Sequence, residues 1–435
     1  MTEFESVIQR GPKTVFEERR ERAVTVGVDR PGLAWSLASS LAELERLADT
    51  AGADVVATTT QKLDSPNPRT FVGSGKAEEI ADLCRAHAAD LVIFDDELTP
   101  SQQSNLEKIV GKKVKVIDRT ALILDIFALH ATTKEGRLQV RLAQNQYLLP
   151  RLRGMWAHLA SNRMGGGVGS RFGEGESQLE VDRRMVRKRI TSIKRELNHL
   201  AEVRNLQRES RYASGMFKVA IAGYTNAGKS SLINRLTNAD VLSYDKLFAT
   251  LDSTTRKYEL PEGREITITD TVGFIQKLPT TLVEAFKSTL DEITGADFIL
   301  HVIDASSDEF ESQVDSVNQI LDQIGAQSIP RIEVFNKCDL LTEEELAAFK
   351  SRFPFSLQIS AHTGLGIDDL IERIAQAASS SDQLIEVLIP YTRGDLVSIA
   401  HERCHVISET HKEVGTQIIM RVGESYRSLF SNFEF

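Results

Sequence analysis

The sequence predicts an α/β protein of several domains, and three observations lead to this prediction. Short β-rich runs alternate with helical patterns over residues 23–136, which is typical of an α/β layered sheet. An apolar run at residues 217–222 leads directly into Gly-x-x-x-x-Gly-Lys-Ser and a helical pattern. Across residues 137–212, apolar residues recur at helical spacings, which predicts a long antiparallel helical hairpin.

The composition is that of an ordinary globular chain. Its 435 residues exceed what one hydrophobic core usually serves, so two to four domains are expected. We find no membrane-length apolar run and no leader pattern, so we expect a cytoplasmic protein without a membrane span. The net charge of −10 argues against a general nucleic-acid binder but allows local basic patches. Cys84, Cys338 and Cys404 are too few and too widely spaced for a disulfide framework, so we expect reduced, structural thiols.

Residues 1–22 are mostly charged and are predicted to form a loose tail before an α/β domain at 23–136. Its strands are expected at 23–28, 54–57, 91–94 and 114–117, and its helices after Ser36, over about 77–88, and after Thr99 and Pro100.

Two stretches of this domain allow two interpretations each. Residues 71–76 could form a phosphate loop, although a glycine turn into a helix is favoured. The acidic residues 95–97 could bind a metal, although a solvated cap is favoured.

The hairpin is predicted over residues 137–212, with a glycine-rich loop at 163–176 between its helices. Pro150 should kink the first helix, and the second, at about 177–211, should be roughly 50 Å long. The predicted seams are Leu138, Leu142, Asn145, Leu149, Leu152, Trp156 and Leu159 in the first helix and Leu179, Val186, Ile190, Ile193, Leu197 and Leu200 in the second.

The second helix carries an excess of positive charge on its outer face. Its basic residues are Arg183, Arg184, Arg187, Lys188, Arg189, Lys194 and Arg195. This face is either a solvated coiled-coil surface or a contact surface for a phosphate backbone. The glycine-rich loop, with Arg163, Arg171 and Phe172, is either a probe that folds onto RNA or a flexible connection.

The Gly-x-x-x-x-Gly-Lys-Ser stretch reads as a phosphate-binding loop, or P-loop. Gly223 and Gly228 permit backbone conformations in which successive N–H groups point at phosphate oxygens. Lys229 would neutralise the β- and γ-phosphates, and the Ser230 hydroxyl would bind Mg²⁺. Asn226 could add a carbonyl oxygen for a potassium ion, or it could only brace the loop.

Three further motifs follow in the order of a guanine-nucleotide switch. In the sequence Asp-Thr-Val-Gly, Asp270 can hold the Mg²⁺ shell through water and the Gly273 N–H can meet the γ-phosphate. In Asn-Lys-x-Asp, Asp339 can accept both N–H groups on the guanine edge, and a main-chain N–H of residues 360–362 would support it. The sequence therefore predicts a P-loop GTPase domain at 215–378, followed by a linker and a small α+β domain at 384–435.

The residue after Asp-Thr-Val-Gly is Phe274, where Ras-like switches carry a glutamine that orients the attacking water. Phenylalanine cannot hydrogen-bond to water, so we expect slow hydrolysis that a partner stimulates. The alternative is that Phe274 is a buried anchor and another side chain positions the water.

Several of these stretches resemble the HflX family of GTPases, and the resemblance covers nearly the whole chain. It is carried by residues 71–76, 116–127, 178–184, 223–230, 247–252 and 270–275. It implies a cytoplasmic GTPase that engages the large ribosomal subunit and can split stalled ribosomes. The family's Gly-Pro-Gly-Glu is replaced here by residues 172–176, which lack the proline and are one residue longer.

The resemblance also places the first switch at residues 248–252. It nominates Thr250 as the hydroxyl that completes the Mg²⁺ shell, with Thr254 and Thr255 as rivals. The predicted catalytic residues are Lys229, Thr250 and Gly273, and the predicted Mg²⁺ ligands are Ser230, Thr250 and Asp270. The predicted nucleotide contacts are Gly223, Tyr224, Thr225, Asn226, Ala227, Gly228, Lys229, Ser230, Phe248, Ala249, Thr250, Leu251, Asp252, Asp270, Thr271, Val272, Gly273, Asn336, Lys337, Cys338, Asp339, Ser360, Ala361 and His362.

Two functions remain open on the sequence alone. One is a Mg²⁺-dependent GTPase, monomeric when free, that binds the large ribosomal subunit and its RNA through the hairpin and the glycine-rich loop, in ribosome splitting, rescue or biogenesis. The other is a regulatory GTPase whose hairpin is a docking coiled coil for a protein partner.

Overall fold

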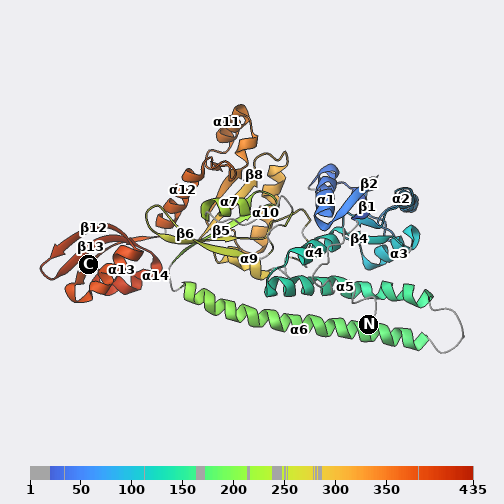
Figure 1. Ribbon diagram of the computed structural model, residues 1–435, viewed down its shortest axis with the longest axis horizontal. Coiled ribbons are helices and arrows are strands. Elements are labelled where there is room, and N and C mark those ends of the chain that lie inside the picture. The colour runs from blue at the N-terminus through green and yellow to red at the C-terminus, as the bar shows by residue number, and fades with distance from the viewer. Residues whose placement is uncertain are drawn as a thin grey trace. The chain divides into compact units, whose positions relative to one another are not determined.

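A computed structural model gives the fold of most of the chain. It describes residues 20–33, 35–111, 113–162, 172–212, 216–237, 247–248, 251, 253–277, 279, 282, 287–380 and 382–434. The chain forms two compact units, Met1–Leu122 and Ile123–Phe435, and each is described by itself (Figure 1).

The first unit contains a four-stranded parallel sheet in the order β2-β1-β3-β4. Parallel neighbours need crossover connections, and a helix supplies each one, which confirms the predicted α/β alternation. The strands are β1 (Glu21–Asp29), β2 (Ala53–Lys62), β3 (Leu91–Phe94) and β4 (Lys115–Asp118), and the helices are α1 (Leu37–Ala51), α2 (Ser74–Ala86) and α3 (Pro100–Val110). The buried core is apolar and includes Val24, Val26, Ile80, Val92 and Leu106.

The helices of this unit begin where the sequence indicates. The Ser36 side chain accepts a hydrogen bond from the Ser39 N–H, and Thr99 forms a capping box with Gln102 at the start of α3. Residues 71–76 form the predicted glycine turn into α2, with Gly73 as its N-cap.

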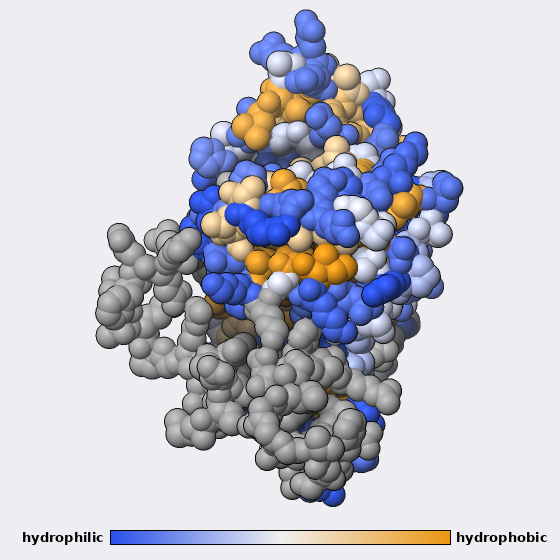
Figure 2. All heavy atoms as spheres, turned by 90° about the vertical axis from the view of Figure 1, so that its right-hand side faces the viewer, coloured by the Kyte–Doolittle hydropathy of each residue, from blue (hydrophilic) through white to orange (hydrophobic). Residues whose placement is uncertain are grey.

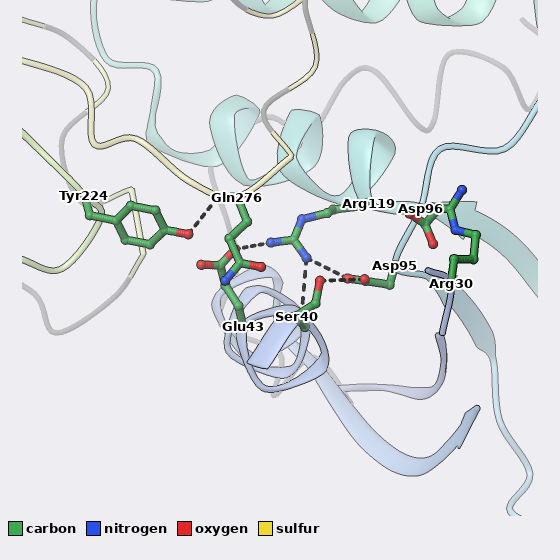
Figure 3. A network of polar contacts seen from close by, with 8 residues as sticks. All are labelled: Arg30, Ser40, Glu43, Asp95, Asp96, Arg119, Tyr224 and Gln276. Atoms are coloured by element: carbon green, nitrogen blue, oxygen red, sulfur yellow. Dashed lines mark hydrogen bonds and ion pairs between the residues drawn. The ribbon is translucent and has the colours of Figure 1, made fainter. Parts of the chain in front are cut away.

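Two details of the predicted domain are corrected. The sheet begins at Glu21, because Glu21 and Arg22 pair with β2, so the loose tail does not extend to residue 22. Asp95 is not in a solvated cap: it is buried and pairs with Arg119 at 2.7 Å (Figure 3). Arg119 also pairs with buried Glu43, so the guanidinium compensates two carboxylates away from water.

A long helical hairpin opens the second unit. Helix α4 (Arg119–His130) crosses the division between the units, and α5 (Lys134–Asn162) and α6 (Phe172–Tyr212) run side by side (Figure 1). Leu138, Leu142, Leu152 and Val186 are buried, and Ile190, Ile193, Leu197 and Leu200 are half-buried. These are predicted seam residues, whereas the side chains of the predicted Trp156, Leu159 and Leu179 lie outside the described part.

The loop between these helices is shorter than predicted. Residues 172–176 belong to α6, and Pro150 lies inside α5. The remainder of the predicted loop, residues 163–171 with Arg163 and Arg171, lies outside the described residues.

A six-stranded sheet follows in the order β10-β9-β8-β5-β7-β6, and only β6 is antiparallel to its neighbour. Its strands are β5 (Phe217–Gly223), β6 (Thr254–Glu259), β7 (Glu265–Asp270), β8 (Phe298–Asp304), β9 (Arg331–Asn336) and β10 (Leu357–Gln358). The associated helices are α7 (Lys229–Thr237), α9 (Lys287–Thr294), α10 (Phe310–Gln323), the short helix η1 (Cys338–Leu340), α11 (Glu343–Arg352) and α12 (Ile367–Ser380). Because the carboxyl ends of parallel strands share one edge, the predicted motifs after β5, β7, β9 and β10 meet there.

A three-stranded antiparallel sheet in the order β11-β13-β12 completes the predicted α+β fold. Its elements are β11 (Gln383–Pro390), η2 (Tyr391–Arg393), α13 (Gly394–Arg403), β12 (His405–Lys412), β13 (Gly415–Val422), α14 (Glu424–Phe430) and η3 (Ser431–Phe433). Helix α12 continues to Ser380, so most of the predicted linker at 378–382 is helical.

The surface is mostly polar. Figure 2 shows one face of the molecule, on which hydrophilic residues surround small hydrophobic areas. Within the described ranges, no helix has the length and apolar character needed to cross a bilayer.

Candidate nucleotide-binding site

The P-loop joins the end of β5 to the start of α7. A Cβ on Gly223 would overlap the carbonyl oxygen of Val302 on β8, so no larger residue fits there. Gly228 has φ +90°, and a Cβ on it would overlap the side-chain nitrogen of Asn336. Asn226, at the exposed tip, has φ +62°, a conformation that asparagine tolerates better than most residues. The loop therefore has the backbone shape that its motif predicts.

Lys229 is enclosed within the P-loop that it follows. Its side chain is buried, and Nζ donates to the carbonyl oxygens of Gly223 at 3.0 Å and Tyr224 at 2.7 Å. Burial lowers the pKa of Lys229 from 10.5 to about 8, although the nearby charge of Asp270 opposes the shift.

The two described residues of the predicted Mg²⁺ site are adjacent. The Ser230 hydroxyl donates to the Asp270 carboxylate at 2.8 Å, which places two oxygen ligands side by side at the start of α7. Thr271 is buried and donates to the Ile221 carbonyl at 2.7 Å, which fixes the strand end that carries Asp270. Val272 is also buried.

The segment after Asp270 lies directly against the P-loop. The Thr225 N–H donates to the Phe274 carbonyl at 2.7 Å, and the Phe274 N–H donates to the Gly223 carbonyl at 3.1 Å. The Gln276 N–H donates to the Tyr224 hydroxyl at 2.7 Å (Figure 3). Phe274 itself is 1% exposed, so it anchors this segment. This burial agrees with the alternative that the sequence left open, in which Phe274 is a buried anchor and another side chain positions the attacking water.

The base-recognition loops are held together by Asn336. Its amide donates to the Ala227 carbonyl at 2.8 Å and accepts from the Ala361 N–H at 2.9 Å. One buried side chain therefore connects the P-loop, the Asn-Lys-x-Asp motif and the loop at 360–362. Lys337, at φ +65°, pairs with Asp304 at 2.7 Å.

Asp339 is exposed and makes no hydrogen bond to a described residue, so its carboxylate is available to guanine. Cys338 is buried, and desolvation raises the pKa of its thiol to about 11, which makes it a packing residue. In the supporting loop, the Ser360 N–H donates to the Leu365 carbonyl and the Ala361 N–H to Asn336. Of the three main-chain N–H groups in this loop, that of exposed His362 is the one with no hydrogen-bond acceptor among the described residues.

The first switch is only partly described. Phe248 is buried with φ +58°, and its ring meets that of Phe127 on α4 edge to face, at 4.6 Å between centroids. Leu251 is buried as well. The side chains of both residues therefore pack inside the fold, and their contacts with nucleotide stay a prediction. The predicted Ala249, Thr250 and Asp252 lie outside the described residues.

Sequence reasoning missed the contacts that join these motifs. Nothing local marks Phe127 as the partner of Phe248, or the Tyr224 hydroxyl as an acceptor for Gln276. The one available signal was the tyrosine itself, because a buried tyrosine usually finds a hydrogen-bond partner.

The fold and this site define a P-loop GTPase: the phosphate loop, the Asp-Thr-Val-Gly segment and the guanine motif meet at one edge of the sheet. Comparisons with known proteins agree. Family models described as "GTP-binding GTPase N-terminal", "GTP-binding GTPase Middle Region" and "50S ribosome-binding GTPase" match residues 38–128, 130–211 and 218–337.

The chain belongs to the HflX family of GTPases. It is 47% identical to GTPase HflX of Caldanaerobacter subterraneus over 394 residues, which are 91% of this chain and 90% of that protein. It is 42% identical to GTPase HflX of Escherichia coli, over 86% of this chain and 88% of that protein. A GTP-binding protein of Sulfolobus solfataricus, solved in complex with GDP, is 24% identical with a TM-score of 0.43, over 82% of this chain and 99% of that chain. The family membership and the matched GTPase domain show that the protein is a GTP hydrolase.

The lowered pKa of Lys229 predicts a pH dependence of nucleotide binding. Phosphate charge stabilises the protonated amine and raises its pKa in the complex. Between about pH 8 and that higher value, binding takes up a proton, so affinity should fall as pH rises above about 8. Calorimetry of GDP binding at pH 9, in two buffers of different ionisation enthalpy, should show uptake of close to about one proton.

Lys229→Arg is the matched control, because arginine stays protonated at this pH and should show no uptake. Equal heats in the two buffers for the unmodified protein would contradict the lowered pKa.

Proposed function

We propose that this GTPase acts on the large ribosomal subunit in the cytoplasm. In its GTP form, a monomer binds the subunit's RNA through the hairpin, and hydrolysis releases it, in ribosome splitting, rescue or biogenesis. Two facts support this: a basic stripe on α6, and the family description "50S ribosome-binding GTPase", which matches residues 218–337.

The basic stripe is the observation that carries the proposal. It is the face of α6 formed by Arg184, Arg187, Lys188, Thr191, Ser192 and Arg195. All six residues are exposed, and none of the four cations forms an ion pair with a described residue. Cations that are neither buried nor neutralised in a chain of net charge −10 fit contacts with phosphate.

The opposite face of α6 is occupied by the hairpin itself. Val186 is buried, Ile190 and Ile193 are half-buried, and Arg204 pairs with Glu135 of α5. Packing against α5 thus uses the apolar seam and leaves the basic stripe on the other side. The hairpin therefore presents positive charge to its partner and not an apolar surface, which is what binding to RNA requires.

We propose that Mg²⁺ completes the nucleotide site. Ser230 and Asp270 fit this ion, because their hydroxyl and carboxylate oxygens lie 2.8 Å apart beside the P-loop. Ser230 would bind the ion directly and Asp270 through water, and Thr250 would complete the shell. The ion would neutralise charge that develops on the phosphates. A potassium ion beside Asn226 stays a prediction.

A packing contact gives the hairpin a route to the first switch. Phe127 lies on α4, which ends four residues before α5 begins, and its ring packs on that of Phe248. Phe248 is held at φ +58°, a conformation that costs free energy in a bulky residue and persists only where packing enforces it. A displacement of the hairpin could therefore release or set the first switch.

Charge reversal on the stripe tests the proposal. Arg184, Arg187 and Lys188, each changed to Glu, should weaken co-sedimentation with large subunits by at least about tenfold. The remaining binding should depend less on salt, because fewer counterions are released. The measurement is bound fraction against potassium chloride concentration, with a non-hydrolysable GTP analogue.

A charge-matched variant separates local contact from net charge. Lys350, Arg373 and Lys412 are exposed cations outside the hairpin, and changing them to Glu alters net charge equally. This variant should keep most of the binding. Binding that is insensitive both to salt and to reversal of the stripe would favour the protein-partner function.

A further inference from the structure

GTP hydrolysis needs a group that orients the attacking water, and the described residues that directly follow Gly273 do not include the usual glutamine. Phe274 stands where Ras-like switches carry glutamine, and it is buried with its main chain hydrogen-bonded to the P-loop. Gln276, the next residue with a carboxamide, is 2% exposed, and its main-chain N–H donates to the Tyr224 hydroxyl, so this residue is held inside the fold. We therefore look for an orienting group among the other described side chains of the site.

Thr225, in the P-loop, carries a polar atom that the fold does not use. The residue is 6% exposed, and its hydroxyl oxygen is buried with no hydrogen-bond partner among the described residues. Burying a hydroxyl without a partner is unfavourable, so such a group in a folded protein calls for an explanation. Valine would fill the same space without this cost. A ligand that pairs with the hydroxyl during the reaction cycle supplies the explanation.

The surroundings of Thr225 identify that ligand. A Cβ placed on Gly273 would lie 2.8 Å from Cγ2 of Thr225 and 3.0 Å from Nζ of Lys229. Thr225, Gly273 and Lys229 therefore converge on one small region. In this class of enzyme, the P-loop lysine contacts the β- and γ-phosphates. Thr225 thus borders the γ-phosphate end of the cradle: its methyl group faces Gly273, and a rotation about the Cα–Cβ bond would turn its hydroxyl to that position.

The Thr225 backbone is fixed independently of its side chain. Its N–H donates to the Phe274 carbonyl at 2.7 Å, and the preceding residue, Tyr224, holds the Gln276 N–H through its own hydroxyl. Preorganised groups stabilise a transition state without paying for reorganisation when it forms. The main-chain contacts preorganise Thr225 and leave its hydroxyl without a hydrogen-bond partner among the described residues.

We propose that Thr225 is a catalytic residue that takes over the task of the missing glutamine. Its hydroxyl accepts a hydrogen bond from the attacking water and donates one to a γ-phosphate oxygen. The water oxygen bonds to the γ-phosphorus while the bond from that phosphorus to the bridging oxygen breaks, and its electron pair leaves with GDP. The water proton passes to the released phosphate. This role deepens the GTPase activity described above and does not depend on the ribosome.

Two variants of Thr225 test this role in the full chain without subunits. Thr225→Val keeps the shape and removes the hydroxyl, whereas Thr225→Ser keeps the hydroxyl and removes the methyl group. Single-turnover release of phosphate from radiolabelled GTP should slow at least about tenfold in T225V and stay within about threefold in T225S. The affinity for GDP should change by less than about twofold in both, because the hydroxyl acts on the transition state.

Thermal unfolding with GDP verifies that both variants fold. T225V hydrolysing GTP as fast as the unmodified protein would overturn the role of Thr225 and leave the GTPase activity standing. Equal slowing in T225S and T225V would overturn it as well, because shape and not the hydroxyl would then matter.

Discussion

Asp339→Asn is expected to abolish the preference for guanine nucleotides. The exposed Asp339 carboxylate can accept two N–H groups on the guanine edge, and an amide in its place turns one acceptor into a donor. One charge-assisted hydrogen bond is replaced by two facing donors and the other loses its charge, so GDP affinity should fall by at least about 100-fold. Affinity for xanthosine diphosphate should rise, because xanthine offers an acceptor where guanine has a donor. Calorimetric titration with both nucleotides measures the change.

Glu343→Gln is the matched control for this prediction. Glu343 lies in the first turn of α11, four residues after Asp339, and it is also exposed. Neutralising it removes the same charge without touching the base and should leave GDP affinity within about twofold. Equal affinity of the unmodified protein for ATP and GTP would refute base selection by Asp339.

Large ribosomal subunits are expected to accelerate GTP hydrolysis by about 10³-fold or more. Without a glutamine after Gly273, the isolated protein should turn over at or below the unassisted Ras-like rate of roughly 10⁻⁴ s⁻¹. The hydroxyl of Thr225 gives a basal rate, but the first switch must still be ordered for full activity. Docking of the hairpin would supply that order through α4 and the contact between Phe127 and Phe248.

Local signals predicted much of this molecule. Helix α3 begins at Thr99 and Pro100 because the Thr99 side chain accepts a hydrogen bond from the Gln102 N–H and proline suits the first helical position. Both signals lie within four residues of each other. The P-loop could be predicted from the spacing of its glycines, because Gly228 adopts φ +90°, a backbone conformation that favours glycine. Such features depend on neighbours in sequence or on a required backbone shape, so they can be read before the fold is known.

Distant partners could not be predicted. Asp95 follows a strand within an acidic run, which indicated a solvated cap, yet Arg119, 24 residues later, pairs with it in the core. Glu43 and Arg119 are separated by 76 residues. The sequence contains the charged residues but not the distances between them. Only the folded sheet shows that the buried carboxylates lie beside a guanidinium that neutralises them.

The same limit applies to the nucleotide site. Each motif was predicted with its chemistry, but their connections were not. The Gln276 N–H reaches Tyr224 across 52 residues, and Asn336 reaches Ala227 across 109. Phe248 was predicted to touch nucleotide from its place in a family motif, and the motif gave no sign that its ring packs on Phe127. Motif membership indicates a role for a segment, whereas the contacts decide which of its side chains perform that role.

The central claim is that the hairpin brings this GTPase to the large subunit and that the subunit activates it. The most direct test is single-turnover GTP hydrolysis with and without purified large subunits. It compares the unmodified protein with the variant in which Arg184, Arg187 and Lys188 are changed to Glu. We predict slow basal hydrolysis in both proteins and strong acceleration by subunits in the unmodified protein only. Fast hydrolysis by the isolated protein that subunits leave unchanged, or equal acceleration of both proteins, would contradict the account.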